Sequence, residues 1–392
     1  MERVKGLDIS VNEFIENAVS WYTERDFSFA LWRLPNQTGL HFASSDNPQS
    51  WTDVNIEEAQ PGFLFSPFDP LQQKIYLPAD ELFQFESNTL VFSKGNHFEN
   101  IIRDKSPERN SSHQNRYILP AVPSIPTDEN NFLKLVTKSR EEIIRGNFEK
   151  IVPSRAKTIT IPDEFSLLNA FNKLCELYPS AMVSIFSSPL TGTWVGASPE
   201  LLVSVSSDSC FHTAAIAGTQ RYEAGVDLRS VSWTQKDIEE QALVERYIIS
   251  CFKKIRLREF EEHGPKTIIA GNVLHLKTEF KVDMVATNFP QLGSIMLKLL
   301  HPTSAVCGMP LDASLAFLKA NEGYDRQFYS GFLGPLNINK ESHLYVNLRC
   351  MQLLKSDAIL YAGAGVLADS IPEKEWNETE LKMNTLGRVI RQ

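Results

Sequence analysis

A glycine-containing stretch near the C-terminus that leads into an amphipathic segment constrains the fold more than any other part of the sequence. The stretch spans residues 362–366, and the segment that follows spans 370–382. Ser370, followed three positions later by Glu373, forms a capping-box pattern. Pro372 suits a first helical turn because its missing N–H removes no helical hydrogen bond. We therefore expect a glycine turn that feeds a helix beginning near residue 371.

This expected helix carries charged residues on one face. Glu375, Glu378 and Lys382 are spaced at i, i+3 and i+7, so two carboxylates and an ammonium lie together. Gly363 and Gly365 allow backbone N–H groups to approach an anion just ahead of the helix N-terminus. The pattern indicates a site for an anionic ligand and a hard cation. The alternative is a solvated helix with an ordinary surface ion pair between Glu378 and Lys382.

The composition is that of a soluble globular protein with a large core. The chain has 392 residues, of which 42% are hydrophobic, and a net charge of -9, so neither nucleic acid nor a membrane surface is expected as a partner. Five cysteines without a CxxC spacing indicate reduced thiols rather than zinc ligands or disulfides. The sequence has neither a signal-peptide pattern nor an apolar run near the ~20 residues of a membrane span. We therefore expect a cytoplasmic protein.

A polar segment rich in turn residues and prolines divides the chain. It covers residues 104–127 and includes Pro120, Pro123 and Pro126. We expect residues 1–126 to form a variable N-terminal part, with a short helix from Val11 and a meander of strands. Residues 127–392 are expected to carry the chemistry.

Three residues of the second half are candidates for catalysis or binding. Lys150 opens an expected strand, a position that is more typical of a surface lysine. Glu200 lies in an expected strand over residues 193–205, where burial would raise its pKa and make it suitable as a general acid. Arg349 lies in an expected alternating strand over 343–354, where it either binds a substrate carboxylate in a bidentate manner or faces solvent.

A second acidic helix is expected after Thr234, which forms a capping-box pattern with Asp237. Asp237 and Glu240 lie on the same face as the apolar Val244, so their carboxylates point towards the core. Buried carboxylates must be protonated, paired with a lysine such as Lys236 or Lys382, or bound to a cation. An all-oxygen site with positions left for water and substrate suits Mg²⁺.

Taken in order, these segments closely resemble the chorismate-binding enzymes, the family of isochorismate, salicylate, anthranilate and aminodeoxychorismate synthases. The resemblance extends from about Phe132 to Leu386. Its most specific segments are GASPELLV (196–203), AIAGT (215–219), KDIEEQALV (236–244), LHPTSAVCG (300–308), the spacing of Glu322, Arg326, Tyr329 and Gly331, and AGAGV followed by SIPEKEWNETELK. Membership would imply one large α+β domain in which two packed β-sheets are flanked by helices.

The resemblance implies a Mg²⁺-dependent isochorismate synthase with water as the nucleophile. Lys150 matches the base that activates water, whereas Ala217 stands where aminodeoxychorismate synthases carry a nucleophilic lysine. Lys150 would deprotonate a water that attacks C2 of chorismate, while Glu200 protonates the departing C4 hydroxyl. Monomeric action without a glutaminase partner is expected.

The resemblance also implies a set of ligand-binding residues. Glu240 and Glu378 would hold Mg²⁺, with Asp237 and Glu375 supporting it through water. The residues expected to bind substrate are Gly218, Thr219, His301, Thr303, Tyr329, Arg349, Gly363, Gly365 and Lys382.

Three other functions remain open on the sequence. A salicylate synthase shares Lys150 and Glu200 and goes on to eliminate pyruvate, an aminating synthase would need a glutaminase partner, and a degenerate relative would bind without turnover. Gln241, Asn347 and Cys350 depart from the family pattern. Gln241 leaves the expected metal ligands intact, whereas Asn347 and Cys350 bear on substrate discrimination rather than on the reaction class. Menaquinone and siderophore biosynthesis are both open as the pathway.

Overall fold

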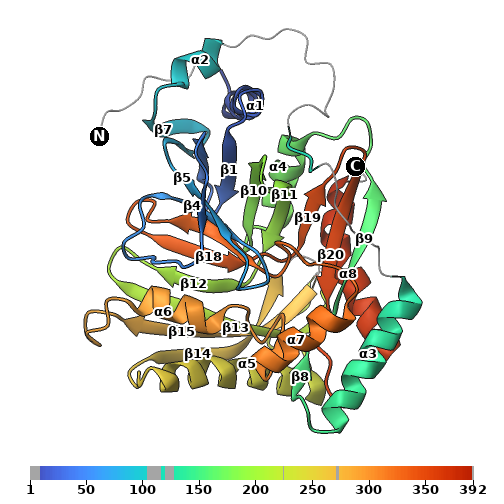
Figure 1. The fold of residues 1–392 in the computed structure, drawn as a ribbon. Coiled ribbons are helices and arrows are strands. Elements are labelled where there is room, and N and C mark those ends of the chain that lie inside the picture. Colours follow the sequence, from blue (N-terminus) through green and yellow to red (C-terminus); the bar gives the residue numbers. More distant parts are fainter. Residues whose placement is uncertain (1–8, 104–115, 120–127, 224, 271–272, 391–392) are drawn as a thin grey trace.

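Two antiparallel sheets organise the residues that this computed structural model describes, which are 9–103, 116–119, 128–223, 225–270 and 273–390 (Figure 1). The first sheet has the spatial order β7 (Thr89–Lys94), β6 (Glu81–Glu86), β2 (Leu40–Ser45), β1 (Ser28–Arg33), β10 (Met182–Ser188), β11 (Gly192–Ser198), β19 (Cys350–Leu353), β20 (Asp357–Gly363) and β9 (Ser154–Thr160). The second has the order β14 (Glu261–Ala270), β15 (Val273–Asp283), β13 (Cys210–Arg221), β12 (Leu201–Val205), β18 (Ser342–Val346), β17 (Phe332–Leu336), β4 (Gly62–Ser66), β5 (Lys74–Pro78) and β3 (Gln49–Trp51). A two-stranded ladder joins β8 (Lys150–Ile151) to β16 (Gly308–Met309).

The helices cover the outer faces of the two sheets. On the first sheet pack α1 (Val11–Thr23), α4 (Leu167–Leu177) and α8 (Pro372–Ile390). On the second pack α5 (Gln235–Lys254) and α6 (Leu292–Leu300). The remaining helices are α2 (Phe98–Arg103), which contacts α1, α3 (Glu129–Ile144), which contacts α8, and α7 (Leu311–Asn321), which contacts β16. The result is a layered α+β architecture with two packed sheets between helices, as the resemblance implied.

An apolar core fills the space between the sheets. Trp32 and Phe186 from the first sheet pack with Phe63, Phe65 and Leu333 from the second, and all five are buried. Phe65 and Phe186 have ring centroids 4.8 Å apart. Burial of such large side chains gives the two sheets a fixed relative position, because interiors pack at crystal-like density.

The chain passes from one sheet to the other at two places. At both places the sequence pattern had predicted a continuous strand. The expected strand over 193–205 is broken at Pro199, so β11 lies in the first sheet and β12 in the second. The expected strand over 343–354 ends at Val346, and β19 resumes in the first sheet. The alternation predicted through Arg349 is therefore wrong. Both breaks lie at the junction of the sheets, which places Glu200 and Arg349 there.

The N-terminal strands are part of both sheets. β1, β2, β6 and β7 belong to the first sheet, and β3, β4 and β5 belong to the second. The expected helix from Val11 is α1, which begins after the N-cap Ser10. The predicted boundary at residues 126 and 127 falls outside the described residues. Within the described ranges, no helix is long and apolar enough to span a membrane.

The C-terminal glycine stretch differs in part from the prediction. Gly363 ends β20 and α8 begins at Pro372, close to the expected start. Neither Gly363 nor Gly365 has a positive φ, so the stretch is extended chain rather than a glycine turn. The Ser370 hydroxyl accepts a hydrogen bond from the Leu367 backbone N–H (3.0 Å), which precedes the helix, in place of the expected capping box.

Candidate active site

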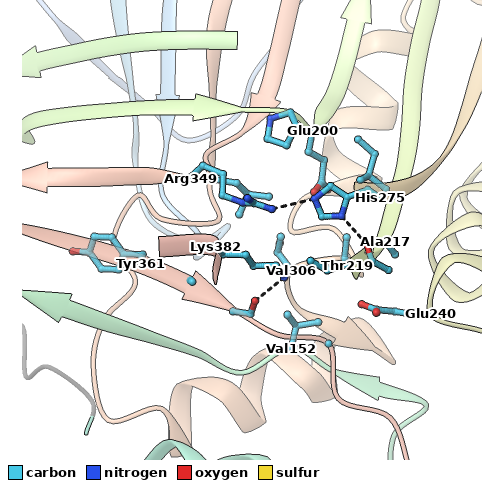
Figure 2. Close-up of a pocket in the computed structure, with 18 of the residues that line it drawn as sticks. Val152, Glu200, Ala217, Thr219, Glu240, His275, Val306, Arg349, Tyr361 and Lys382 are labelled. Atoms are coloured by element: carbon cyan, nitrogen blue, oxygen red, sulfur yellow. Dashed lines mark hydrogen bonds between the residues drawn. The ribbon is translucent and has the colours of Figure 1, made fainter. Parts of the chain in front are cut away.

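A pocket lies where the two sheets meet, and most of the predicted site residues line it (Figure 2). Nine of them form part of its wall: Glu200, Gly218, Thr219, Glu240, Tyr329, Arg349, Gly363, Gly365 and Lys382. Ala217 lies beside them. The structure thus brings together residues that are far apart in the sequence and that come from both sheets, α5 and α8.

Glu200 occupies the turn between β11 and β12 and is only 5% exposed. Burial raises the pKa of its carboxyl to about 7, and the hydrogen bond from the Thr303 hydroxyl (3.3 Å) and the charge of Lys150 oppose that rise without cancelling it. Glu200 is therefore partly protonated near neutral pH. A protonated carboxyl at the pocket wall can act as a general acid.

Lys150 is fully buried, contrary to the surface position that is typical of a lone lysine. It lies on β8, and its Nζ is 2.8 Å from Oε1 of Glu240 on α5. Burial by itself would raise the pKa of Glu240, but the ammonium groups of Lys150 and Lys236 hold that pKa below its ordinary value. The pair places a buried amine next to the pocket.

Gly365 is required by this pair. A Cβ at position 365 would lie 2.1 Å from Glu240 Oε1 and 3.1 Å from Lys150 Cε, so any other residue would displace the carboxylate. The role of Gly365 is therefore close approach of the backbone to a side chain.

The other expected metal-binding carboxylates also have partners. Glu375 is buried and lies 2.5 Å from Lys236 Nζ, and Glu378 Oε1 lies 2.6 Å from Lys382 Nζ. Burial and the negative charge of Glu378 raise the pKa of Glu375 to about 7. The pair of Glu378 with Lys382 that the sequence left open is therefore present, whereas Lys236 pairs with Glu375 rather than with Asp237 or Glu240.

These carboxylates fit Mg²⁺ in their chemistry, although not as a preformed cage. Within the described ranges, no group of three or more His, Cys, Asp or Glu side chains is placed to hold a metal ion. The Asp237 carboxylate caps its own helix, accepting from the Thr234 backbone N–H (3.2 Å) and hydroxyl (2.6 Å). Glu240 and Glu378 offer oxygen ligands neutralised by lysines that a divalent cation can replace. Mg²⁺ binding by Glu240 and Glu378 stays a prediction.

Part of the pocket wall is cationic, because Arg349 and Lys382 both line it. Arg349 is buried, and Lys382 Nζ donates to the Gly363 carbonyl (2.9 Å) as well as pairing with Glu378. Gly218 and Thr219 lie at an irregularity in the β13–β15 register, which exposes their backbone to the pocket. Together these groups can bind a carboxylate-bearing ligand.

Two predicted binding residues take other positions. His301 is buried outside the pocket wall, where its Nε2 lies 3.1 Å from the Pro67 carbonyl, and burial lowers its pKa to about 3. It therefore has the surroundings of a structural histidine. Thr303 acts through Glu200, to which its hydroxyl donates.

The structure adds pocket residues that the sequence did not single out as functional. They include Val152, His275, Ala305, Val306 and Tyr361. Four of them are apolar or aromatic and resemble ordinary core positions in the sequence. The sequence around His275 did not indicate a function either, because its hydrogen-bond partners come from distant segments.

Comparisons with known proteins agree with the sequence resemblance. A family model described as "Chorismate binding enzyme" matches residues 73–391. Isochorismate synthase DhbC of Bacillus subtilis is 28% identical over 295 residues, which are 72% of this chain and 72% of DhbC. Isochorismate synthase EntC of Escherichia coli is 28% identical over 276 residues, which are 67% of this chain and 68% of EntC.

A comparison of folds also finds a solved structure of an isochorismate synthase. The solved structure of MenF, the menaquinone-specific isochorismate synthase of Escherichia coli, matches with a TM-score of 0.73 at 20% sequence identity, and the match covers 96% of this chain and 91% of MenF. At that identity the likeness shows a shared fold. Because the family model spans most of the sequence, this chain belongs to the chorismate-binding enzyme family.

Proposed function

We propose that the protein is an isochorismate synthase that converts chorismate to isochorismate with Mg²⁺ as its cofactor. The observation that carries the proposal is that the protonatable Glu200 carboxyl and Ala217 lie in the wall of one pocket, with the buried Lys150 amine 2.8 Å from the wall residue Glu240. A base and an acid are the two groups that addition and loss of water require. The names of the relatives DhbC, EntC and MenF support this choice.

In the proposed reaction, the Lys150 ammonium that pairs with Glu240 first loses its proton to solvent, and the neutral amine then takes a proton from water as the water oxygen bonds to C2 of chorismate. The ring double bonds shift, the bond from C4 to its hydroxyl breaks, and Glu200 gives its proton to the departing oxygen. One water enters and one water leaves, so the net change is an isomerisation. Ala217 has no amine, which removes the competing nucleophile of aminating relatives and supports action without a glutaminase partner.

The substrate carboxylates account for the cationic wall. Arg349, Tyr329 and the backbone at Gly363 and Gly365 would bind the enolpyruvyl carboxylate, and Lys382 would lie near the ring carboxylate. Mg²⁺ bound by Glu240 and Glu378 would neutralise and orient that ring carboxylate. Glu375 would support the cation through water.

Product analysis tests the function. Purified protein is incubated with chorismate and Mg²⁺, with and without ammonium, and the products are separated. We expect isochorismate as the accumulating product in both mixtures. Salicylate with pyruvate would instead indicate a salicylate synthase, an amine formed only with ammonium an aminating synthase, and unchanged chorismate a binding protein.

The cation assignment predicts a selective loss in Glu378→Gln. This variant removes one oxygen ligand while Lys382 keeps its bond to the Gly363 carbonyl. We expect the Mg²⁺ midpoint to rise on the order of tenfold or more, measured both as a Mg²⁺-dependent thermal shift without chorismate and as activity. Glu373→Gln, on the exposed side of the same helix, is the matched control. Equal Mg²⁺ midpoints in Glu378→Gln and the wild type would contradict the assignment.

A further inference from the structure

Arg349 has an unusual set of partners for a buried arginine. It lies between β18 and β19, is 7% exposed and has a backbone φ of 48°. Its side chain contacts two neutral groups, His275 Nε2 at 3.0 Å from Nη2 and the Thr385 hydroxyl at 3.4 Å from Nη1. Among the described residues, no carboxylate lies within ion-pair distance of it. A buried cation held only by neutral groups keeps its capacity to bind an anion.

The partners of His275 define its protonation state. Its Nδ1 lies 2.6 Å from the Gly218 carbonyl, which can only accept, so Nδ1 carries the hydrogen. Its Nε2 faces a guanidinium, which can only donate, so Nε2 must offer its lone pair. Burial, reinforced by the charge of Arg349, lowers the pKa of His275 to about 3 and keeps the ring neutral. Figure 2 shows the ring between its two partners.

We propose that His275 is a positioning residue for substrate binding, which aims the Arg349 guanidinium by linking it to the Gly218 carbonyl. The inference rests on the proposed function for the identity of the ligand. His275 lies on β15 in the second sheet, whereas Arg349 lies where the chain leaves that sheet for the first. The imidazole therefore fixes a side chain whose own backbone is at a break between sheets. The remaining guanidinium N–H groups are left for a carboxylate.

Two substitutions separate the two contacts of the ring. In His275→Asn the amide N–H can replace Nδ1–H and keep the Gly218 bond, but the side chain is too short to place an acceptor at the position of Nε2. In His275→Gln the longer side chain can place its amide oxygen near the position of Nε2. We expect KM for chorismate to rise about tenfold in His275→Asn with a smaller change in kcat, and about threefold or less in His275→Gln. His212→Asn, on the neighbouring strand β13 and outside the pocket wall, is the control.

A double-mutant cycle with Arg349→Gln tests whether His275 acts through the arginine. Once Arg349 is gone, His275→Asn should weaken chorismate binding no further, because the group that it positions is absent. Dissociation constants from calorimetric titration with chorismate and Mg²⁺ are used, so that the cycle can be read without turnover. Thermal unfolding confirms that each variant is folded.

The outcomes separate the inference from the proposed function. Additive losses in the cycle, or equal effects of His275→Asn and His275→Gln, would overturn the positioning role and leave the function intact. A wild-type protein that binds chorismate but forms no isochorismate would overturn the proposed function alone, since the cycle is read on binding. A wild-type protein that does not bind chorismate would overturn both.

Discussion

Lys150→Ala is expected to lower turnover on the order of 10²-fold or more, while the dissociation constant for chorismate changes far less. The amine is the only group in the proposed mechanism that accepts a proton from the attacking water. Alanine removes it and also leaves the buried Glu240 carboxylate without its 2.8 Å partner. Steady-state kinetics over a range of pH, together with calorimetric binding of chorismate, measure the two effects separately.

A matched control exists on a neighbouring strand. Lys157 on β9 pairs with Glu380 at 2.9 Å, but it is far more exposed than Lys150, and its carboxylate partner lies outside the pocket wall, unlike Glu240. Lys157→Ala should therefore keep near-normal turnover. If Lys150→Ala also keeps near-normal turnover at every pH, Lys150 is not the base, and water loses its main support as the selected nucleophile.

Glu200→Gln is expected to reduce turnover by a similar factor, on the order of 10²-fold or more. Glutamine keeps the size and the hydrogen-bonding capacity of the side chain but cannot give a proton to the departing C4 hydroxyl. In the wild type the acid form is lost as pH rises, so kcat/KM should fall through about pH 7. A wild-type profile that stays flat or rises well above pH 7 would contradict the assignment of Glu200 as the acid.

The same substitution should stabilise the folded protein at alkaline pH. The carboxyl pKa is raised from 4.5 in the unfolded chain to about 7 in the folded protein. The folded state therefore binds more protons than the unfolded state between those values, and wild-type stability falls as pH rises through this window. Glu200→Gln does not lose stability in this way. The unfolding free energy of the variant minus that of the wild type should therefore increase by about 3 kcal/mol from pH ~4 to pH ~8. Denaturant unfolding of both proteins at each pH measures the difference, and a constant difference would contradict the raised pKa.

Local patterns in the sequence predicted three helices, which begin at or close to the expected residues. The capping box of Thr234 with Asp237 is present at the start of α5, as expected. Helix ends depend on contacts within a few residues, so a single sequence contains most of what determines them. The helical spacing of Glu375, Glu378 and Lys382 was predicted for the same reason.

The breaks at the sheet junction could not be predicted from periodicity. The strands on both sides of Pro199 are mostly buried, so the sequence pattern looks the same whether one strand continues or the chain changes sheet. The positive φ of Arg349 is equally hidden, since arginine has no preference for that conformation. Sheet membership is decided by pairing with distant strands, such as Gly196 with Cys350.

Site residues were predicted where the family resemblance supplied their roles. They were missed where the role of a residue depends on contacts with distant parts of the chain. Gly365 was expected to expose backbone to an anion, yet its observed contact is with Glu240. The role of His275 depends on its hydrogen bonds with Gly218 and Arg349, which lie 57 and 74 residues away along the chain. Long-range hydrogen bonds of this kind leave no periodic trace in one sequence.

The central claim is that water, activated at this pocket, becomes the new hydroxyl of isochorismate. Mass analysis of the product formed from chorismate and Mg²⁺ in water enriched in oxygen-18, sampled early in the reaction, tests it most directly. The account predicts isochorismate heavier by one oxygen-18 substitution, with the label at the C2 hydroxyl. Unlabelled isochorismate would contradict the account, because the C4 hydroxyl would then have migrated without exchange with solvent.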